Sequence, residues 1–231
     1  MPEATAVHRA LDGASYVLRG DFELDRPATS VADIVVGNRM HEFTSGVAQL
    51  ADDVAKALGL SGFDEEFSFN GGTLRTAVKR EYDPQNHLVE EPLLVSWCGE
   101  NYSLVTRMYH ASVSDAVALL RTLGVDERDD GLYFTPDEEI GMAGPATVIK
   151  EIPRLGLLEM ALPSEEQTAQ LPPWKGISVS AGELYRDTLA NGNPFFVLSA
   201  QDVWATVVPL ADTDVDTVPA LVDGLSITVA E

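Results

Sequence analysis

The sequence predicts an α+β fold of two antiparallel-sheet lobes, each with a hairpin and a helix packed on one face. Two observations carry this prediction. Strand-like runs follow one another directly instead of alternating with helices, as they would in a parallel sheet. In addition, residues 92–125 and 194–227 share one order of strand, turn, strand, polar cap and short helix. A chain of 231 residues, 45% of them hydrophobic, is long enough to bury such cores.

The first forty residues are predicted to form strands. Apolar residues run together or alternate at 16–18, 22–24 and 32–36. Gly37 and Asn38 then end the last of these runs. We therefore expect the chain to begin with a sheet.

From Thr44 the apolar spacing changes to that of a helix, with Val47 and Leu58 near its two ends. Thr44 or Ser45 could cap the start of this helix, and Gly59 stands where a left-handed cap belongs. The polar residues fall on the other side of the helix. We expect a helix over 44–58 that packs one face on a sheet.

Two hairpins and a second helix are predicted to follow. Asn70 and Gly71 favour a tight turn in the first hairpin. Ser112 begins the pattern of a capping box, and Gly124 ends the helix that follows. The predicted elements are a hairpin of 67–69 with 74–78, a hairpin of 92–96 with 102–108, and a helix over 112–123.

The two similar segments align without a gap at an offset of 102 residues, which puts Pro92 on Pro194 and Tyr102 on Trp204. Internal duplication of about 92–125 and 194–227 is one interpretation of this match. Chance similarity is the other, because Val and Leu are common and two hairpin-and-helix units look alike without shared ancestry.

The part between the repeats is less regular. Residues 146–152 and 155–162 fit either a strand or a helix. Residues 163–174 are rich in Pro, Gln, Ser and Glu and are the best linker candidate. The sequence therefore predicts an N-terminal α+β lobe of 1–162 and a smaller C-terminal lobe of 163–231, with one continuous domain as the alternative.

Charge is the strongest compositional signal, because 37 Asp and Glu against 15 Lys and Arg leave a formal net charge of -22. Direct binding of nucleic acid is disfavoured, since it needs clustered Lys and Arg. Three interpretations of the acidity compete: a solvated coat, a surface for a basic protein partner, and a mimic of nucleic-acid phosphate. The carboxylates are spread over caps, turns and outer helix faces, which favours the solvated coat.

Familiar catalytic motifs do not occur in the sequence. It contains no phosphate-binding glycine loop, no GxSxG nucleophile elbow and no HExxH zinc motif. Its one cysteine, Cys98, can form no internal disulfide. Asp212, Asp214 and Asp216, with Asp223 further on, resemble part of a calcium loop. Thr217 stands where that loop needs Gly, so a helix cap explains these carboxylates better, and we assign no catalytic residue, cofactor or metal ion.

Large apolar side chains near or within the second repeat are the candidate partner-binding residues. They are Trp174, Phe195, Phe196 and Trp204. A place in the core is the alternative for each of them. Edge strands of the hairpin units would also offer backbone pairing to a partner or to a second copy of the chain.

We therefore expect a non-enzymatic protein-binding module of the adaptor, chaperone or immunity type. It would bind a protein partner through sheet edges and an acidic surface, and one interpretation of the acidity is that this partner is basic. The sequence is also compatible with a homo-oligomer. No run of 18 apolar residues and no signal-peptide pattern occurs, so we expect a cytoplasmic protein away from membranes. A structural subunit of a larger assembly, such as a virion or secretion machine, and an enzyme without a familiar motif are the alternatives.

Overall fold

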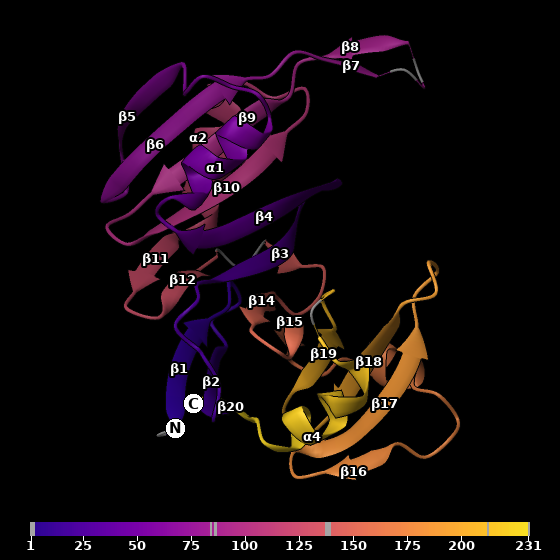
Figure 1. Cartoon of the computed structure of the whole chain (residues 1–231). Coiled ribbons are helices and arrows are strands. Elements are labelled where there is room, and N and C mark those ends of the chain that lie inside the picture. Colours follow the sequence, from indigo (N-terminus) through magenta and orange to yellow (C-terminus); the bar gives the residue numbers. More distant parts are fainter. Residues whose placement is uncertain (1–2, 84, 86, 137–139, 212, 231) are drawn as a thin grey trace. The chain divides into compact units, whose positions relative to one another are not determined.

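The computed structural model in Figure 1 describes residues 3–83, 85, 87–136, 140–211 and 213–230. The protein is 49% strand and 15% helix, and its sheets are mostly antiparallel. This confirms a mixed α+β class, with a small helical share. The chain forms two compact units: unit 1 holds residues 1–10, 14–30 and 144–231, and unit 2 holds 11–13 and 31–143.

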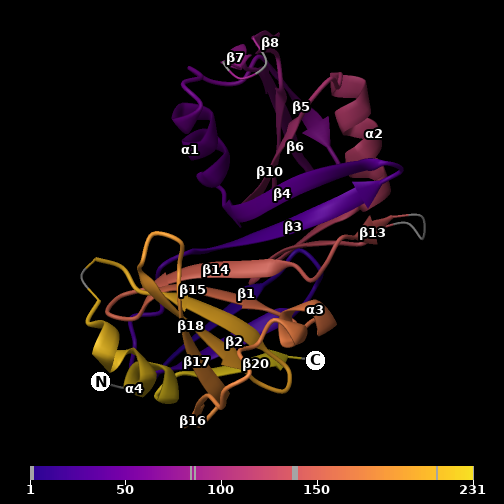
Figure 2. The ribbon, with the colours of Figure 1, turned by 90° about the vertical axis from the view of Figure 1, so that its right-hand side faces the viewer.

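Unit 2 is built on an antiparallel sheet with strands in the order β3-β4-β10-β9-β6-β5, and β13 pairs with β3. Figure 2 shows α1 and α2 on opposite faces of this sheet. The hairpin of β7 and β8 projects from the unit (Figure 1). The elements are β3 (Ala28–Val36), β4 (Arg39–Val47), α1 (Leu50–Ala57), β5 (Glu65–Phe69), β6 (Gly72–Val78), β7 (Glu81–Asp83), β8 (Leu88–Glu90), β9 (Leu93–Cys98), β10 (Tyr102–Met108), α2 (Val113–Leu123), β11 (Val125–Arg128), β12 (Gly131–Phe134) and β13 (Gly141–Met142).

The turn between β5 and β6 follows directly from its sequence. Phe69 pairs with Gly72, and the two residues between them, Asn70 and Gly71, have positive φ angles of 45° and 75°. Two such residues make a type I′ turn, whose twist matches that of the flanking strands. The predicted hairpin is therefore confirmed.

The start of α2 is also as predicted. The backbone N–H of Asp115 donates to Ser112 Oγ at 3.2 Å, and the backbone N–H of Ser112 donates to Asp115 Oδ2 at 2.7 Å. This reciprocal capping box satisfies two N–H groups that the helix itself leaves unpaired. The helix ends at Gly124, where φ is 55°.

Helix α1 corrects one prediction, because it begins at Leu50 and not at Thr44. Thr44 and Ser45 pair with β10 as part of β4, so neither hydroxyl caps a helix. The N-cap is Gln49, which makes no side-chain capping bond. The C-terminal prediction is confirmed: Gly59 has a φ of 73° and its N–H donates to the carbonyl of Lys56 at 2.9 Å.

Unit 1 contains a second antiparallel sheet with strands in the order β16-β17-β18-β19-β15-β14, and a three-stranded sheet in the order β1-β2-β20. No helix in the described part of the chain is long and apolar enough to cross a membrane. The elements are β1 (Ala4–Arg9), β2 (Ser15–Gly20), β14 (Thr147–Ile152), β15 (Gly156–Ala161), α3 (Glu165–Ala169), β16 (Ile177–Val179), β17 (Gly182–Thr188), β18 (Pro194–Ser199), β19 (Trp204–Val208), the 3-10 turn η1 (Val215–Thr217), α4 (Val218–Asp223) and β20 (Ser226–Ala230).

Several expectations for unit 1 change. The two ambiguous segments are strands, β14 and β15. Phe22 and Leu24 do not form the predicted strand but are buried in an irregular segment, with 6% and 5% of their surface exposed. Residue 163, where the sequence places a lobe boundary, lies inside unit 1, and the chain passes between the two units after residues 10, 13, 30 and 143.

Both units run their strands in the same order. The path β3-β4-β10-β9-β6-β5 of unit 2 corresponds to β14-β15-β19-β18-β17-β16 of unit 1, and the chain visits the strands and helices in the same sequence. The Cys98–Ser103 pair that closes the β9–β10 turn corresponds to the Ser199–Trp204 pair, which gives an offset of 101 instead of 102. A shift of one residue moves every side chain to the other face of a strand.

Candidate partner-binding face of unit 1

The larger sheet of unit 1 has one buried face and one half-buried face. Along β18, Phe196 and Leu198 are each only 1% exposed, and along β19 Ala205 and Val207 are similarly buried. The residues between them are half-buried. Because successive side chains of a strand point to opposite faces, the buried residues form a core and their neighbours form a second face.

This second face, which we call the open face, carries five side chains of β18 and β19. The register pairs Val197 with Thr206 and places Trp204 opposite Ser199. Val208 pairs with Leu157 of β15, which is also half-buried. The five residues are Phe195, Val197, Trp204, Thr206 and Val208.

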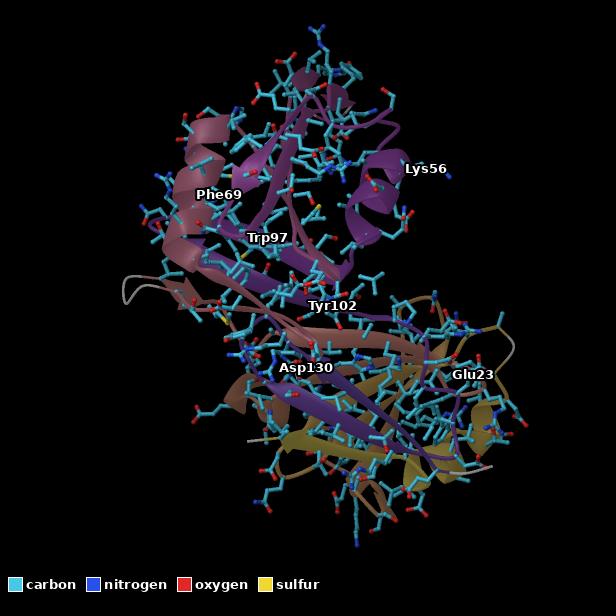
Figure 3. All side chains as sticks on the ribbon, turned by 90° about the vertical axis from the view of Figure 1, so that its left-hand side faces the viewer. Glu23, Lys56, Phe69, Trp97, Tyr102 and Asp130 are labelled. Carbon is cyan, nitrogen blue, oxygen red and sulfur yellow. The ribbon has the colours of Figure 1, made fainter. Side chains whose placement is uncertain are left out.

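The corresponding face of unit 2 is covered by α1. Leu94 of β9 and Val105 of β10 form one buried cluster with Ala51 and Ala55 of the helix. At an offset of 101, Leu94 corresponds to Phe195 and Val105 to Thr206. The polar side of α1 faces outward, where Lys56 points away from the sheet (Figure 3).

An arginine of the sheet also contacts α1. Arg75 of β6 donates from Nη2 to Asp52 Oδ1 of the helix at 2.8 Å. Its guanidinium carbon also lies 4.0 Å from the centre of the Phe63 ring, close enough for a cation–π contact. On the other face of the same sheet, Trp97 is 4% exposed and its indole N–H donates to the carbonyl of Phe69 at 3.0 Å (Figure 3). Both faces of the unit 2 sheet are therefore covered.

The helix at the same place in unit 1 does not provide such a cover. α3 lies between β15 and β16 as α1 lies between β4 and β5, but it has only 5 residues and none of them is buried. Ser164 and Gln167 form a capping box that starts it. A five-residue helix with no buried side chain contributes almost no apolar contact, so the open face keeps its aromatic residues half-exposed.

Carboxylates border the open face on two sides. Glu159 of β15 pairs with Thr206, and on β17 Asp187 pairs with Phe195. Glu183, also on β17, accepts a hydrogen bond from the Tyr185 hydroxyl at 2.5 Å. That bond to Glu183, with burial, raises the pKa of Tyr185. An apolar centre between negative borders favours a partner surface with an apolar stripe and flanking cations.

The structure places the four predicted partner-binding residues at different sites. Phe195 and Trp204 lie together on the open face. Phe196 is a correction: it points the other way and is 1% exposed, so its ring belongs to the core. Trp174 is 57% exposed and lies in the segment before β16.

Sequence reasoning missed Val197, Thr206 and the acidic border of the open face. Val197 and Thr206 could have been found from the sequence. If 194–199 and 204–208 are half-buried strands, every second residue faces the same side of the sheet, and this alternation groups both residues with Phe195 and Trp204. The border could not be found in this way, because it requires the pairing of β15 and β17 with their neighbours.

The sequence predicts that the carboxylates around 212–223 cap a helix and do not bind a metal ion. Within the described residues no group of His, Cys, Asp or Glu has metal-binding geometry, and Asp212 lies outside them. Asp214 accepts from the backbone N–H of Asp216 at 3.2 Å, as a helix cap does. Asp223 accepts from the backbone N–H and hydroxyl of Ser180 at 2.6 and 2.8 Å, and these bonds lower the pKa of its carboxyl.

Comparison of the chain with models of known protein families, with curated protein sequences and with solved structures finds no match.

Proposed function

We propose that this protein is a protein-binding module whose open face seats an amphipathic helix of a partner. The observation that carries the proposal is internal to the chain. The same face of the same strand order in unit 2 is covered by α1, whereas in unit 1 no residue of α3 is buried and the residues of β18 and β19 on this face are only half-buried. A partner helix would therefore take the position that α1 occupies in unit 2.

The chemistry of the partner follows from this arrangement. α1 approaches its sheet through the small side chains of Ala51 and Ala55, so a partner helix with small residues along one stripe would approach equally closely. The acidic border formed by Glu159, Glu183 and Asp187 favours Lys or Arg beside that stripe. The net charge of -22 would also accelerate the encounter with a basic partner.

We also propose that the two units descend from one duplicated ancestor. Their shared order of strands and helices supports this, as does the same four-residue connection between Cys98–Ser103 and Ser199–Trp204. In this view the helix that covered the open face in the ancestor shortened to α3, and a partner replaced it.

A designed peptide tests the proposal directly. The probe copies residues 48–60, which include α1, with lysine at the outward positions of Gln49 and Asp53. We expect it to bind the full chain and change the fluorescence of Trp204. A peptide of the same composition with its apolar residues scrambled should not bind, because it lacks a continuous apolar stripe.

Two matched variants locate the binding surface. Thr206→Arg puts a bulky cation in the centre of the open face and should weaken binding about tenfold or more. Thr5→Arg makes the same change on exposed β1 and should leave affinity unaltered. Equal affinity of the two variants, or equal binding of the scrambled peptide, would contradict the proposal.

A further inference from the structure

The turn between β9 and β10 in unit 2 holds a carboxylate. Glu127 of β11 accepts hydrogen bonds from three consecutive backbone N–H groups, those of Glu100 at 2.8 Å, Asn101 at 2.6 Å and Tyr102 at 3.0 Å. The turn itself is closed by the N–H of Gly99, which donates to the carbonyl of Tyr102 at 2.9 Å. Successive N–H groups that converge in this way form an anion-binding concavity.

The turn between β18 and β19 in unit 1 has the same length and closure. The N–H of Ala200 donates to the carbonyl of Val203 at 3.0 Å. The N–H groups of Gln201, Asp202 and Val203 correspond to the three that bind Glu127, but no described residue accepts a hydrogen bond from them. The strand that follows the helix, β20, lines the site with Ser226–Val229 and offers no carboxylate.

The residues of this turn, 200–203, line a groove of about 580 Å³ in unit 1. The groove runs along β20, which is an edge strand of the three-stranded sheet. Arg19 of β2 is its one cation, and within the described part of the chain the guanidinium makes no ion pair or hydrogen bond.

One difference between the two turns limits how a ligand can bind. A Cβ on Gly99 would lie 2.0 Å from Glu127 Oε2, the oxygen bound to the N–H of Glu100. Unit 1 has Ala200 at this position, so its methyl group blocks the equivalent approach to the N–H of Gln201. The N–H groups of Asp202 and Val203 remain, and no described residue accepts a hydrogen bond from either of them.

We infer that this groove binds the terminal carboxylate of an extended peptide. One carboxylate oxygen accepts from the N–H groups of Asp202 and Val203, and the other faces Arg19. The free edge of β20 then pairs with the peptide backbone. Glu3, Asp202 and Asp223 line the same groove, so residues before the terminus are neutral or basic and a ligand with several carboxylates is repelled.

The test compares a hexapeptide of alternating Lys and Val that ends in a free carboxylate with the same peptide ended by an amide. Binding to the full chain is followed through the backbone amide NMR signals. We expect the acid to shift the signals of Asp202 and Val203, and the amide to bind about tenfold more weakly. Acetate at millimolar concentration should shift the same two signals, because it supplies the same group.

Variants separate the inference from a structural effect. Arg19→Gln should weaken the acid peptide about tenfold, whereas Arg186→Gln, which removes a cation outside the groove, should not. Ala200→Gly should strengthen binding because it opens the third amide. Equal affinity of acid and amide peptides, unshifted Asp202 and Val203 signals, or equal losses from both arginine variants would overturn the inference. Thr206→Arg should not alter this binding, so its outcome is independent of the helix-binding proposal.

Discussion

The contact between Glu127 and the β9–β10 turn makes a sharp prediction for stability. Glu127→Ala removes the acceptor of three backbone N–H groups, at 2.8, 2.6 and 3.0 Å. Hydrogen bonds to a charged group contribute about 1.5–3 kcal/mol each when buried, but this turn is partly exposed and water replaces some of the loss. We therefore expect unit 2 to lose about 2 kcal/mol of stability, a fall of about 6–10 °C in Tm for a unit of this size.

A second substitution, in the turn itself, disrupts the same contact. Gly99→Ala places a Cβ 2.0 Å from Glu127 Oε2 and must expel the carboxylate. The φ of Gly99 is not in the left-handed region, so alanine adds no backbone strain there. The two single variants should lose similar stability, and the double variant should lose no more than either of them.

Urea unfolding followed by Trp97 fluorescence measures this loss, in a background where Trp174 and Trp204 are replaced by Phe so that only unit 2 reports. Glu100→Ala is the control, because its side chain is exposed and takes no part in the turn. The reasoning is refuted if Glu127→Ala stays within about 0.5 kcal/mol of that control, or if the effects of the two substitutions add.

Three further outcomes are expected. Ser112→Ala should cost α2 about 1 kcal/mol through loss of its cap, while Ser114→Ala, two residues further on and outside the capping box, should cost much less, as urea unfolding can show. Gly71→Ala should cost about 1 kcal/mol from backbone strain alone, since φ is 75° and nothing lies within 4 Å of the new Cβ; a smaller loss in the same assay would argue against the type I′ turn. Burial lowers the pKa of Lys150 in the folded protein. Between this pKa and that of the unfolded chain, Lys150 is neutral when folded and protonated when unfolded, so the unfolded chain binds more protons. The free energy of unfolding should therefore rise with pH through that window. Unfolding measured at several alkaline pH values should show this rise in the wild type and lose it in Lys150→Met.

Features set by neighbouring residues could be predicted well. Asn70 and Gly71 can both adopt positive φ, and Ser112 and Asp115 can cap each other, whatever lies further away. Gly59 likewise ends α1 because it reaches a conformation that other residues adopt at a cost. These signals do not depend on the rest of the chain.

Features that depend on residues far away in the chain could not be predicted from the sequence. Thr44 and Ser45 have side chains suited to a helix cap, but pairing with β10 extends the strand through them. The exposure of Phe195 and the burial of Phe196 follow from the register of β18 with β17 and β19. The sequence offset of 102 differs by one residue from the structural one, and that single residue reverses which face each side chain occupies.

The sequence by itself determined the acidic charge, the α+β class, the Asn70–Gly71 turn, the capping box of α2 and the end of α1 at Gly59, because each depends on composition or on residues a few positions apart. Only the tertiary structure decided that unit 1 has an open face where unit 2 has a helix, and that the β18–β19 turn and Arg19 line one groove. Both sites join strands far apart in the chain, and strand pairing over such distances depends on which edges and faces become buried together.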